Sequence, residues 1–142
     1  MPLNILVAED NKELADSYRT ILEARGHTVT ITSNGIECTN IYRQYLERQV
    51  DGTIKRYFDL VILDQKMLYK DGIQTAKEIQ QANPAQKIIF VTGYGESVLQ
   101  KLPQLLGKVV VMNKPFTAEA FVTQVETLGA GKLHEMPKTI RN

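Results

Sequence analysis

Short, uninterrupted apolar runs alternate with longer mixed segments along this chain. Residues 5–8, 60–63, 88–91 and 109–112 carry no polar side chain. Runs of this length are typical of strands buried on both faces of a parallel sheet. Residues 29–31 differ, because Val29 and Ile31 alternate with threonines, and this pattern predicts a half-exposed edge strand. The pattern therefore predicts five strands.

The segments between these strands carry apolar residues at helical spacing. The sets are Leu14, Tyr18, Ile21 and Leu22; Cys38, Ile41, Tyr42, Tyr45 and Leu46; Ile73, Ala76 and Ile79; Val98, Leu102, Leu105 and Leu106; and Phe121, Val122, Val125 and Leu128. Gly26 is the predicted C-cap of the first helix and Thr117 the predicted N-cap of the last. Pro84 should end the third helix, and Pro103 should kink or shorten the fourth.

Strands and helices that alternate in this way predict an α/β fold. We expect a doubly wound, five-stranded parallel sheet with right-handed crossovers. The sheet order should be 2-1-3-4-5, because the second strand is the least apolar and belongs at an edge. Residues 1–129 then form one domain, and residues 130–142, which follow the last predicted helix, form a flexible C-terminal tail.

Composition narrows the class of protein. With 142 residues, 43% of them hydrophobic and 23% charged, the chain is typical of one globular domain. A net charge of +1 gives no overall field for nucleic acid or a membrane surface. The sequence contains no leader and no apolar run near the membrane-spanning length, so we expect a cytoplasmic protein. Cys38, the only cysteine, should face the core, and His27 should be an exposed turn residue.

Charged side chains follow three of the predicted strands. Glu9 and Asp10 follow the first, Asp64 the third and Lys114 the fifth. Sites in such sheets form beyond the carboxyl ends of the strands, so these groups should meet at one rim. Two like charges about 4 Å apart repel by roughly 4 kcal/mol at an effective dielectric constant near 20. One lysine does not neutralise three acids, and ligands that offer only oxygen favour Mg²⁺.

A magnesium ion beside an exposed aspartate suits phosphoryl transfer. It would lower the repulsion between the Asp64 carboxylate and an approaching phosphoryl group. Lys114 would supply a positive charge for one phosphoryl oxygen, and the hydroxyl of Thr92 would contact another. Such transfer requires positioning and charge neutralisation more than covalent chemistry.

On these positions the chain resembles the receiver domain of two-component response regulators. The matching residues are Glu9 and Asp10, Asp64, Thr92, and Lys114 with Pro115; residues 64–72 also match the family's loop, with Met67 and the Asp71-Gly72 turn in register. The resemblance covers roughly residues 3–128. It implies a flavodoxin-like receiver fold of the stand-alone, single-domain type.

The resemblance also implies roles for individual residues. Asp64 would be the phosphoacceptor, and Glu9, Asp10 and Asp64 would hold Mg²⁺ together with the backbone carbonyl of Lys66. Lys114 would pair with the phosphoryl group, and its bond to Pro115 would be cis.

Three further roles follow from the same resemblance. Thr92 would contact the phosphoryl group and relay its presence to the fourth helix. Lys66 and Tyr94 occupy positions that influence access of the hydrolytic water in receivers.

Four features depart from the family pattern. Leu68 replaces the usual proline, which should loosen the loop after Asp64. Val111 stands where receivers usually carry a switch tyrosine or phenylalanine, and Pro103 disturbs the fourth helix. Residues 47–56 account for extra length before the third strand, and we expect them at the end of the sheet away from Asp64.

The resemblance implies a signalling domain that catalyses its own phosphorylation and slow dephosphorylation, and otherwise no enzyme. Its phosphodonor would be a sensor histidine kinase or a histidine phosphotransfer protein, and its output would be partner binding or onward phosphotransfer. Formation of a homodimer on phosphorylation stays open, and neither nucleic acid nor membrane is an expected partner. One alternative is an interaction module that signals without phosphorylation, which Val111 favours. Another, a magnesium-dependent phosphohydrolase, ranks low because such enzymes carry a second acid where this chain has Lys66.

Overall fold

The computed structural model describes residues 2–48, 52, 54–55, 57–130 and 139–140. Its main sheet is entirely parallel, with the strand order β2-β1-β5-β6-β7-β8. The strands are β1 (Asn4–Ala8), β2 (Thr28–Thr32), β5 (Leu60–Leu63), β6 (Ile88–Thr92), β7 (Val109–Asn113) and β8 (Thr139–Ile140). The five predicted strands therefore form in the predicted order, with β2 at an edge, and a short sixth strand extends the sheet beside β7.

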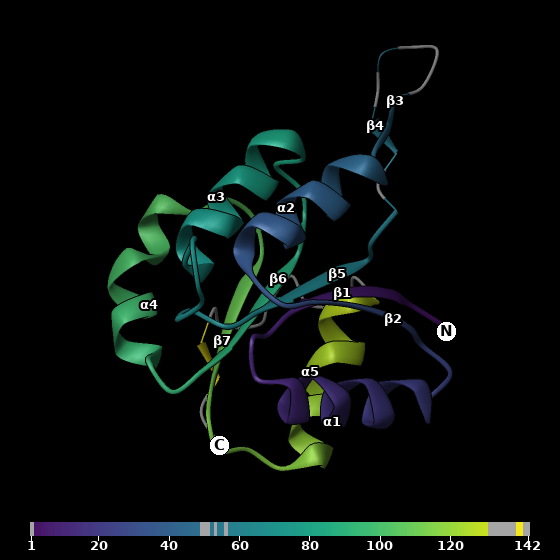
Figure 1. The fold of residues 1–142 in the computed structure, drawn as a ribbon, viewed down its shortest axis with the longest axis vertical. Helices are drawn as coiled ribbons and strands as arrows, with labels where there is room; N and C mark the ends of the chain where they lie inside the picture. Colours follow the sequence, from purple (N-terminus) through teal and green to yellow (C-terminus); the bar gives the residue numbers. More distant parts are fainter. Residues whose placement is uncertain (1, 49–51, 53, 56, 131–138, 141–142) are drawn as a thin grey trace.

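Helices cover both faces of the sheet (Figure 1). They are α1 (Lys12–Glu23), α2 (Gly35–Gln44), α3 (Gly72–Ala82), α4 (Gly95–Lys101) and α5 (Ala118–Gly129). Helices α2, α3 and α4 contribute to one hydrophobic core, and α1 and α5 contribute to a second core on the opposite face. Successive apolar residues of β1, β5, β6 and β7 alternate between the two cores, which explains their uninterrupted apolar runs, whereas β2 contributes Val29 and Ile31 to the second core only.

Side-chain caps fix where four helices begin. The caps are Asn11, Asn34, Asp71 and Thr117, and each accepts the backbone N–H three residues later. The prediction that Thr117 caps α5 is therefore confirmed. The C-cap of α1 is Ala24, however, and Gly26 lies two residues further on with a φ of +90°. Glycine fits there because it adopts positive φ without a steric penalty.

Pro103 shortens the fourth helix as predicted. Helix α4 ends at Lys101 and continues as a single 3₁₀ turn, η1 (Leu102–Gln104). Leu102 and Leu105 are buried, whereas Leu106, the last apolar residue of the predicted helix, lies beyond the 3₁₀ turn and is 55% exposed. The backbone N–H of Leu106 instead donates to Gln80 Oε1 at 2.7 Å, which ties the end of this segment to α3.

Within the extra segment before β5, the described residues of β3 (Glu47–Arg48) and β4 (Ile54–Lys55) pair as a short antiparallel hairpin. Figure 1 shows it projecting from the end of the molecule at which β5 begins, as expected. Its base is aromatic: the Phe58 ring lies 5.4 Å from that of Tyr45 and 4.9 Å from that of Tyr57, measured between centroids. The hairpin is therefore anchored to the core without approaching the carboxyl ends of the strands.

His27 is buried, and the prediction of an exposed turn residue was wrong. Its Nδ1 accepts the backbone N–H of Leu3 at 3.1 Å, and its Nε2 lies 2.9 Å from Glu126 Oε2. Arg25 donates two further hydrogen bonds to the same carboxylate. The ring therefore joins the start of β1 to α5, and polar partners offset the cost of its burial.

The predicted tail lies largely outside the described residues, since residues 131–138 and 141–142 are not described. Ala130 is the C-cap of α5, and Thr139 and Ile140 form β8. The boundary between domain and tail stays a prediction. Within the described residues, none of the helices combines the length and apolar character that crossing a bilayer requires.

Candidate functional site

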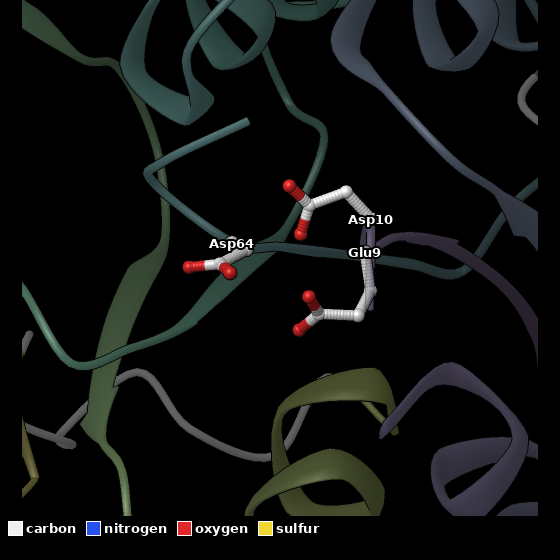
Figure 2. A group of neighbouring side chains, drawn as sticks. All are labelled: Glu9, Asp10 and Asp64. Carbon is white, nitrogen blue, oxygen red and sulfur yellow. The ribbon is translucent and has the colours of Figure 1, made fainter. Parts of the chain in front are cut away.

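Three carboxylates meet at the carboxyl ends of two neighbouring strands. Glu9 and Asp10 follow β1, and Asp64 follows β5, which pairs with β1 through Ala8 and Leu63. One oxygen of each carboxylate lies within 4.8 Å of the other two. In Figure 2 the three side chains surround one small space, with Glu9 and Asp10 approaching it from β1 and Asp64 from β5. The structure thus brings together the three acids that the sequence placed at one rim.

Lys114 reaches the same cluster from the end of β7. Its Nζ donates to Glu9 Oε1 at 3.0 Å and to Asp64 Oδ2 at 3.2 Å. The peptide bond between Lys114 and Pro115 is cis, as predicted. The fourth predicted charge therefore bridges two of the three acids.

Burial and crowding shift the acid–base behaviour of these groups. Burial raises the pKa of Glu9 to about 7, with Lys114 opposing the shift and Asp64 adding to it. Burial lowers the pKa of Lys114, but the hydrogen bond to Glu9 and the charge of Asp64 outweigh this and raise it above its ordinary value. The single positive charge of Lys114 therefore does not balance the three carboxylates of Glu9, Asp10 and Asp64.

Two groups near the cluster have polar side-chain atoms without a protein partner among the described residues. Asp10 is exposed, and among the described residues it forms no hydrogen bond or ion pair. The hydroxyl of Tyr18, on α1, is buried without a hydrogen-bond partner in the described part of the chain. Burial raises the Tyr18 pKa, and the charges of Glu9 and Asp64 raise it further, so this hydroxyl lies within their field. In the sequence, Tyr18 was recognised only as one of the apolar residues at helical spacing in the first helix.

These observations fit a hard divalent cation. Three carboxylates offer oxygen ligands, Asp10 has no competing partner in the described residues, and burial together with the charge of Asp64 raises the pKa of Glu9, so a further cation would stabilise its charged form. Mg²⁺ prefers a few carboxylates, with water or phosphate oxygens completing an octahedron. The acidic cluster is therefore compatible with a bound Mg²⁺.

Gln65 organises the chain immediately after Asp64. Its backbone N–H donates to Asp64 Oδ1 at 2.7 Å, its carbonyl accepts the N–H of Gly72 at 2.8 Å, and its Oε1 accepts the N–H of Ile73 at 2.8 Å. A Cβ at Gly72 would overlap the carbonyl oxygen of Asp64, so only glycine allows α3 to begin this close. The Asp-Gly pair signalled the turn, but nothing in the sequence distinguished Gln65.

The loop between Asp64 and α3 contains a tight turn at Tyr69. Its φ is +71°, and the N–H of Lys70 donates to the carbonyl of Leu68 at 2.8 Å, which closes a three-residue γ-turn. Turns of this kind with positive φ are rare and strained. Leu68 and Tyr69 are 64% and 80% exposed, so the replacement of the family's proline coincides with a protruding loop.

Thr92 ends β6 and is fully buried, and its Oγ1 accepts the N–H of Tyr94 at 3.0 Å. Beyond it, Lys66 Nζ lies 5.4 Å from the centroid of the Tyr94 ring, a cation–π contact. These two residues, with Gln65, Asp71 and Ser97, line an open hollow of about 210 Å³. Lys66, in the loop that follows Asp64, thus contacts Tyr94, the residue before α4.

Val111 lies in β7 and is fully buried in the core shared with α4. A branched aliphatic side chain with no exposed surface cannot exchange buried and exposed rotamers as an aromatic switch residue does. The described residues around this strand therefore lack that device at the position where the family usually has it.

Comparison with known proteins identifies the family. A model of the response regulator receiver domain matches residues 5–126, and the chain belongs to this family. Receiver domains act in two-component signalling and are generally signalling domains rather than enzymes, and a phosphoacceptor role is supported for the family in general.

Individual relatives agree with this assignment. The chain is 28% identical over 124 residues to the response regulator receiver protein CpdR of Brucella abortus, covering 87% of this chain and 94% of CpdR. It is 27% identical to the transcriptional regulatory protein ZraR of Klebsiella oxytoca, over 96% of this chain but 29% of ZraR. Among solved structures, a CheY-like receiver domain from Methanospirillum hungatei superposes with a TM-score of 0.76 at 21% identity, over 92% of this chain and 96% of that one.

Coverage limits what these relatives imply. The chain spans 29%, 18% and 49% of the length of three curated relatives that it matches. Its own 142 residues have the size of a single receiver domain. The comparisons therefore define the fold and the class of protein, whereas partners and output belong to the proposals below.

Proposed function

We propose that Asp64 accepts a phosphoryl group from the phosphohistidine of a sensor histidine kinase or a histidine phosphotransfer protein. The phosphorylated chain then signals by binding a partner or by passing the phosphoryl group onward. One observation carries this proposal: the carboxylates of Glu9, Asp10 and Asp64 converge within 4.8 Å, and Lys114 contacts two of them. The cytoplasmic location predicted from the sequence is consistent with this role.

In the transfer step, a carboxylate oxygen of Asp64 attacks the phosphorus atom of the donor. The new P–O bond forms as the P–N bond breaks, and the leaving imidazole nitrogen keeps the electron pair and takes up a proton. Hydrogen bonds from the Gln65 N–H to Oδ1 and from Lys114 to Oδ2 orient the carboxylate before the donor arrives. Such positioning is a major part of catalysis in phosphoryl transfer.

Four groups would hold Mg²⁺: the carboxylates of Glu9, Asp10 and Asp64, and the backbone carbonyl of Lys66. The bound ion would neutralise charge between Asp64 and the incoming phosphoryl oxygens. Lys114 holds a second phosphoryl oxygen through its raised-pKa ammonium group. The Thr92 hydroxyl already accepts the Tyr94 N–H, so its own proton is available to a third oxygen.

Loss of the phosphoryl group to water would end the signal. The attacking water must reach the phosphorus atom through the surface that Lys66 and Tyr94 flank. We propose that the reaction is slow and catalysed by the receiver itself. Thr92 would relay the phosphorylated state to α4, because its side chain bonds the backbone of Tyr94, the residue before that helix.

The direct test is labelling with a small phosphodonor, such as acetyl phosphate, in the presence of Mg²⁺. Intact-mass measurement should show a gain of one phosphoryl group, and D64N should show none. Removing Mg²⁺ with a chelator should abolish labelling of the unmodified chain. Labelling that D64N retains would remove the assignment of Asp64.

The interaction module that signals without phosphorylation remains the second candidate, because buried Val111 replaces the usual aromatic switch. The two candidates differ in partner binding. Once a partner is identified, its affinity should change when a phosphoryl mimic such as beryllofluoride is added with Mg²⁺. Equal affinities for a chain that does bind the mimic would favour the module.

A further inference from the structure

The outer edge of β7 is only partly paired. Val111 lies opposite Thr139 and Met112 opposite Ile140, and β8 is only these two residues long. The other residues of β7 have no strand partner on this side within the described part of the chain. Unpaired backbone N–H and C=O groups at an edge form a template for another strand.

The crossover from β7 to β8 has the opposite hand to the other crossovers of the sheet. The units β5–α3–β6 and β6–α4–β7 step outward along the sheet with their helices on the face that α2 also covers. The unit β7–α5–β8 steps in the same direction, but α5 packs on the opposite face together with α1 (Figure 1). The same step with the helix on the other face reverses the hand of the crossover.

This reversal is unfavourable when one chain makes both strands. About 98% of parallel crossovers are right-handed, because a right-twisted strand followed by a helix packs back onto the sheet only in that way. The unit β1–α1–β2 obeys the rule, since it steps in the other direction with α1 on the α5 face. The backbone pairing of β8 with β7 satisfies edge groups of β7. The left-handed crossover that joins the two strands through α5 within one chain is unfavourable.

We propose that the outer edge of β7 is a strand-acceptor surface through which two copies of this chain associate, each placing its β8 on the β7 of the other. The strand pairing is then kept, and the left-handed crossover disappears because the paired strands belong to different chains. A reciprocal exchange closes with two-fold symmetry, so association stops at a dimer.

The length of the connection permits this exchange. Nine residues, 130–138, separate the end of α5 at Gly129 from Thr139. Fully extended, nine residues span about 30 Å, whereas α5 ends beside Leu3 at the start of β1, four strand spacings or roughly 19 Å from β8. Only two residues pair in each β8, so the dimer should be weak and should depend on protein concentration.

Two double variants of the full chain test the proposal. T139P/I140P removes both backbone donors of β8, and T139A/I140A shortens the side chains but keeps the donors. Sedimentation velocity over a rising concentration series should show a monomer–dimer equilibrium for the unmodified chain and for the alanine variant. The dissociation constant of the dimer should be at least roughly tenfold higher for the proline variant than for the unmodified chain. Equal thermal unfolding of the variants would show that the fold is intact.

A mixed-isotope experiment separates exchange from pairing within one chain. Labelled and unlabelled copies are mixed, and isotope-filtered NMR detects contacts between chains. Contacts from Thr139 or Ile140 of one copy to Val111 or Met112 of the other would support the proposal. A chain that stays monomeric up to millimolar concentration, a dimer insensitive to the prolines, or contacts confined to one chain would each overturn it.

Discussion

Lys114 Nζ lies 3.0 Å from Glu9 Oε1, which joins the end of β7 to the end of β1 across β5 and β6. Glu9 is almost completely buried, whereas the lysine side chain is 23% exposed. Without the partner, the lysine can still be hydrated, whereas the buried carboxylate of Glu9 has little access to water.

Replacing Lys114 with alanine should destabilise the fold. The change leaves the buried Glu9 without its cation, and loss of one partner of a buried pair costs about 2 kcal/mol where the pair is partly exposed. Urea unfolding at neutral pH measures the effect. The double variant E9Q/K114A should recover part of the loss, because glutamine removes the unpaired charge. A K114A chain as stable as the unmodified one would contradict this reasoning.

Gly72 is required where α3 meets the backbone of Asp64. The G72A substitution should lower the free energy of unfolding by about 1–3 kcal/mol, because the new methyl group overlaps backbone atoms that cannot rotate away. It should also reduce phosphoryl labelling of Asp64. G93A is the matched control, since a Cβ at Gly93 meets no atom within 4 Å. Equal urea midpoints for the two variants would disprove the close-approach argument.

The contact between Lys66 and Tyr94 should lengthen the phosphoryl lifetime by restricting water. An exposed cation–π contact is worth about 0.5–1 kcal/mol, which corresponds to a roughly two- to fivefold change in rate. Y94A should therefore dephosphorylate faster, and Y94F, which keeps the ring, should not. Loss of label after donor removal gives the rate. If Y94A and the unmodified chain lose label equally fast, the contact does not restrict water.

Cys38 should make the fold less stable in alkaline solution. Burial raises the pKa of its thiol from 9.0 to about 12. Between these values the unfolded chain releases the thiol proton and the folded chain keeps it, so stability falls as pH rises above 9. The slope approaches about 1.4 kcal/mol per pH unit for one group. Urea unfolding across this range should show a shallower decline for C38A, and parallel curves would contradict the prediction.

Local pattern determined most of the fold. Apolar runs specified the strands, helical spacing specified the helices, and Pro103 and Thr117 specified where two helices change or begin. These signals are local because propensity, capping and periodicity act within a few residues. Parallel strands meet at their carboxyl ends, so the convergence of Glu9, Asp10, Asp64 and Lys114 also followed from the sequence.

Tertiary structure alone decided which isolated polar residues are buried. His27 is buried because the N–H of Leu3 and the carboxylate of Glu126 meet it there, the latter 99 residues away in the chain. Gln65 gains its role only when Gly72 and Ile73 fold back onto it, and β8 exists only through pairing with β7. A polar side chain enters the interior when distant groups satisfy its hydrogen bonds, and local sequence does not record where those groups will lie.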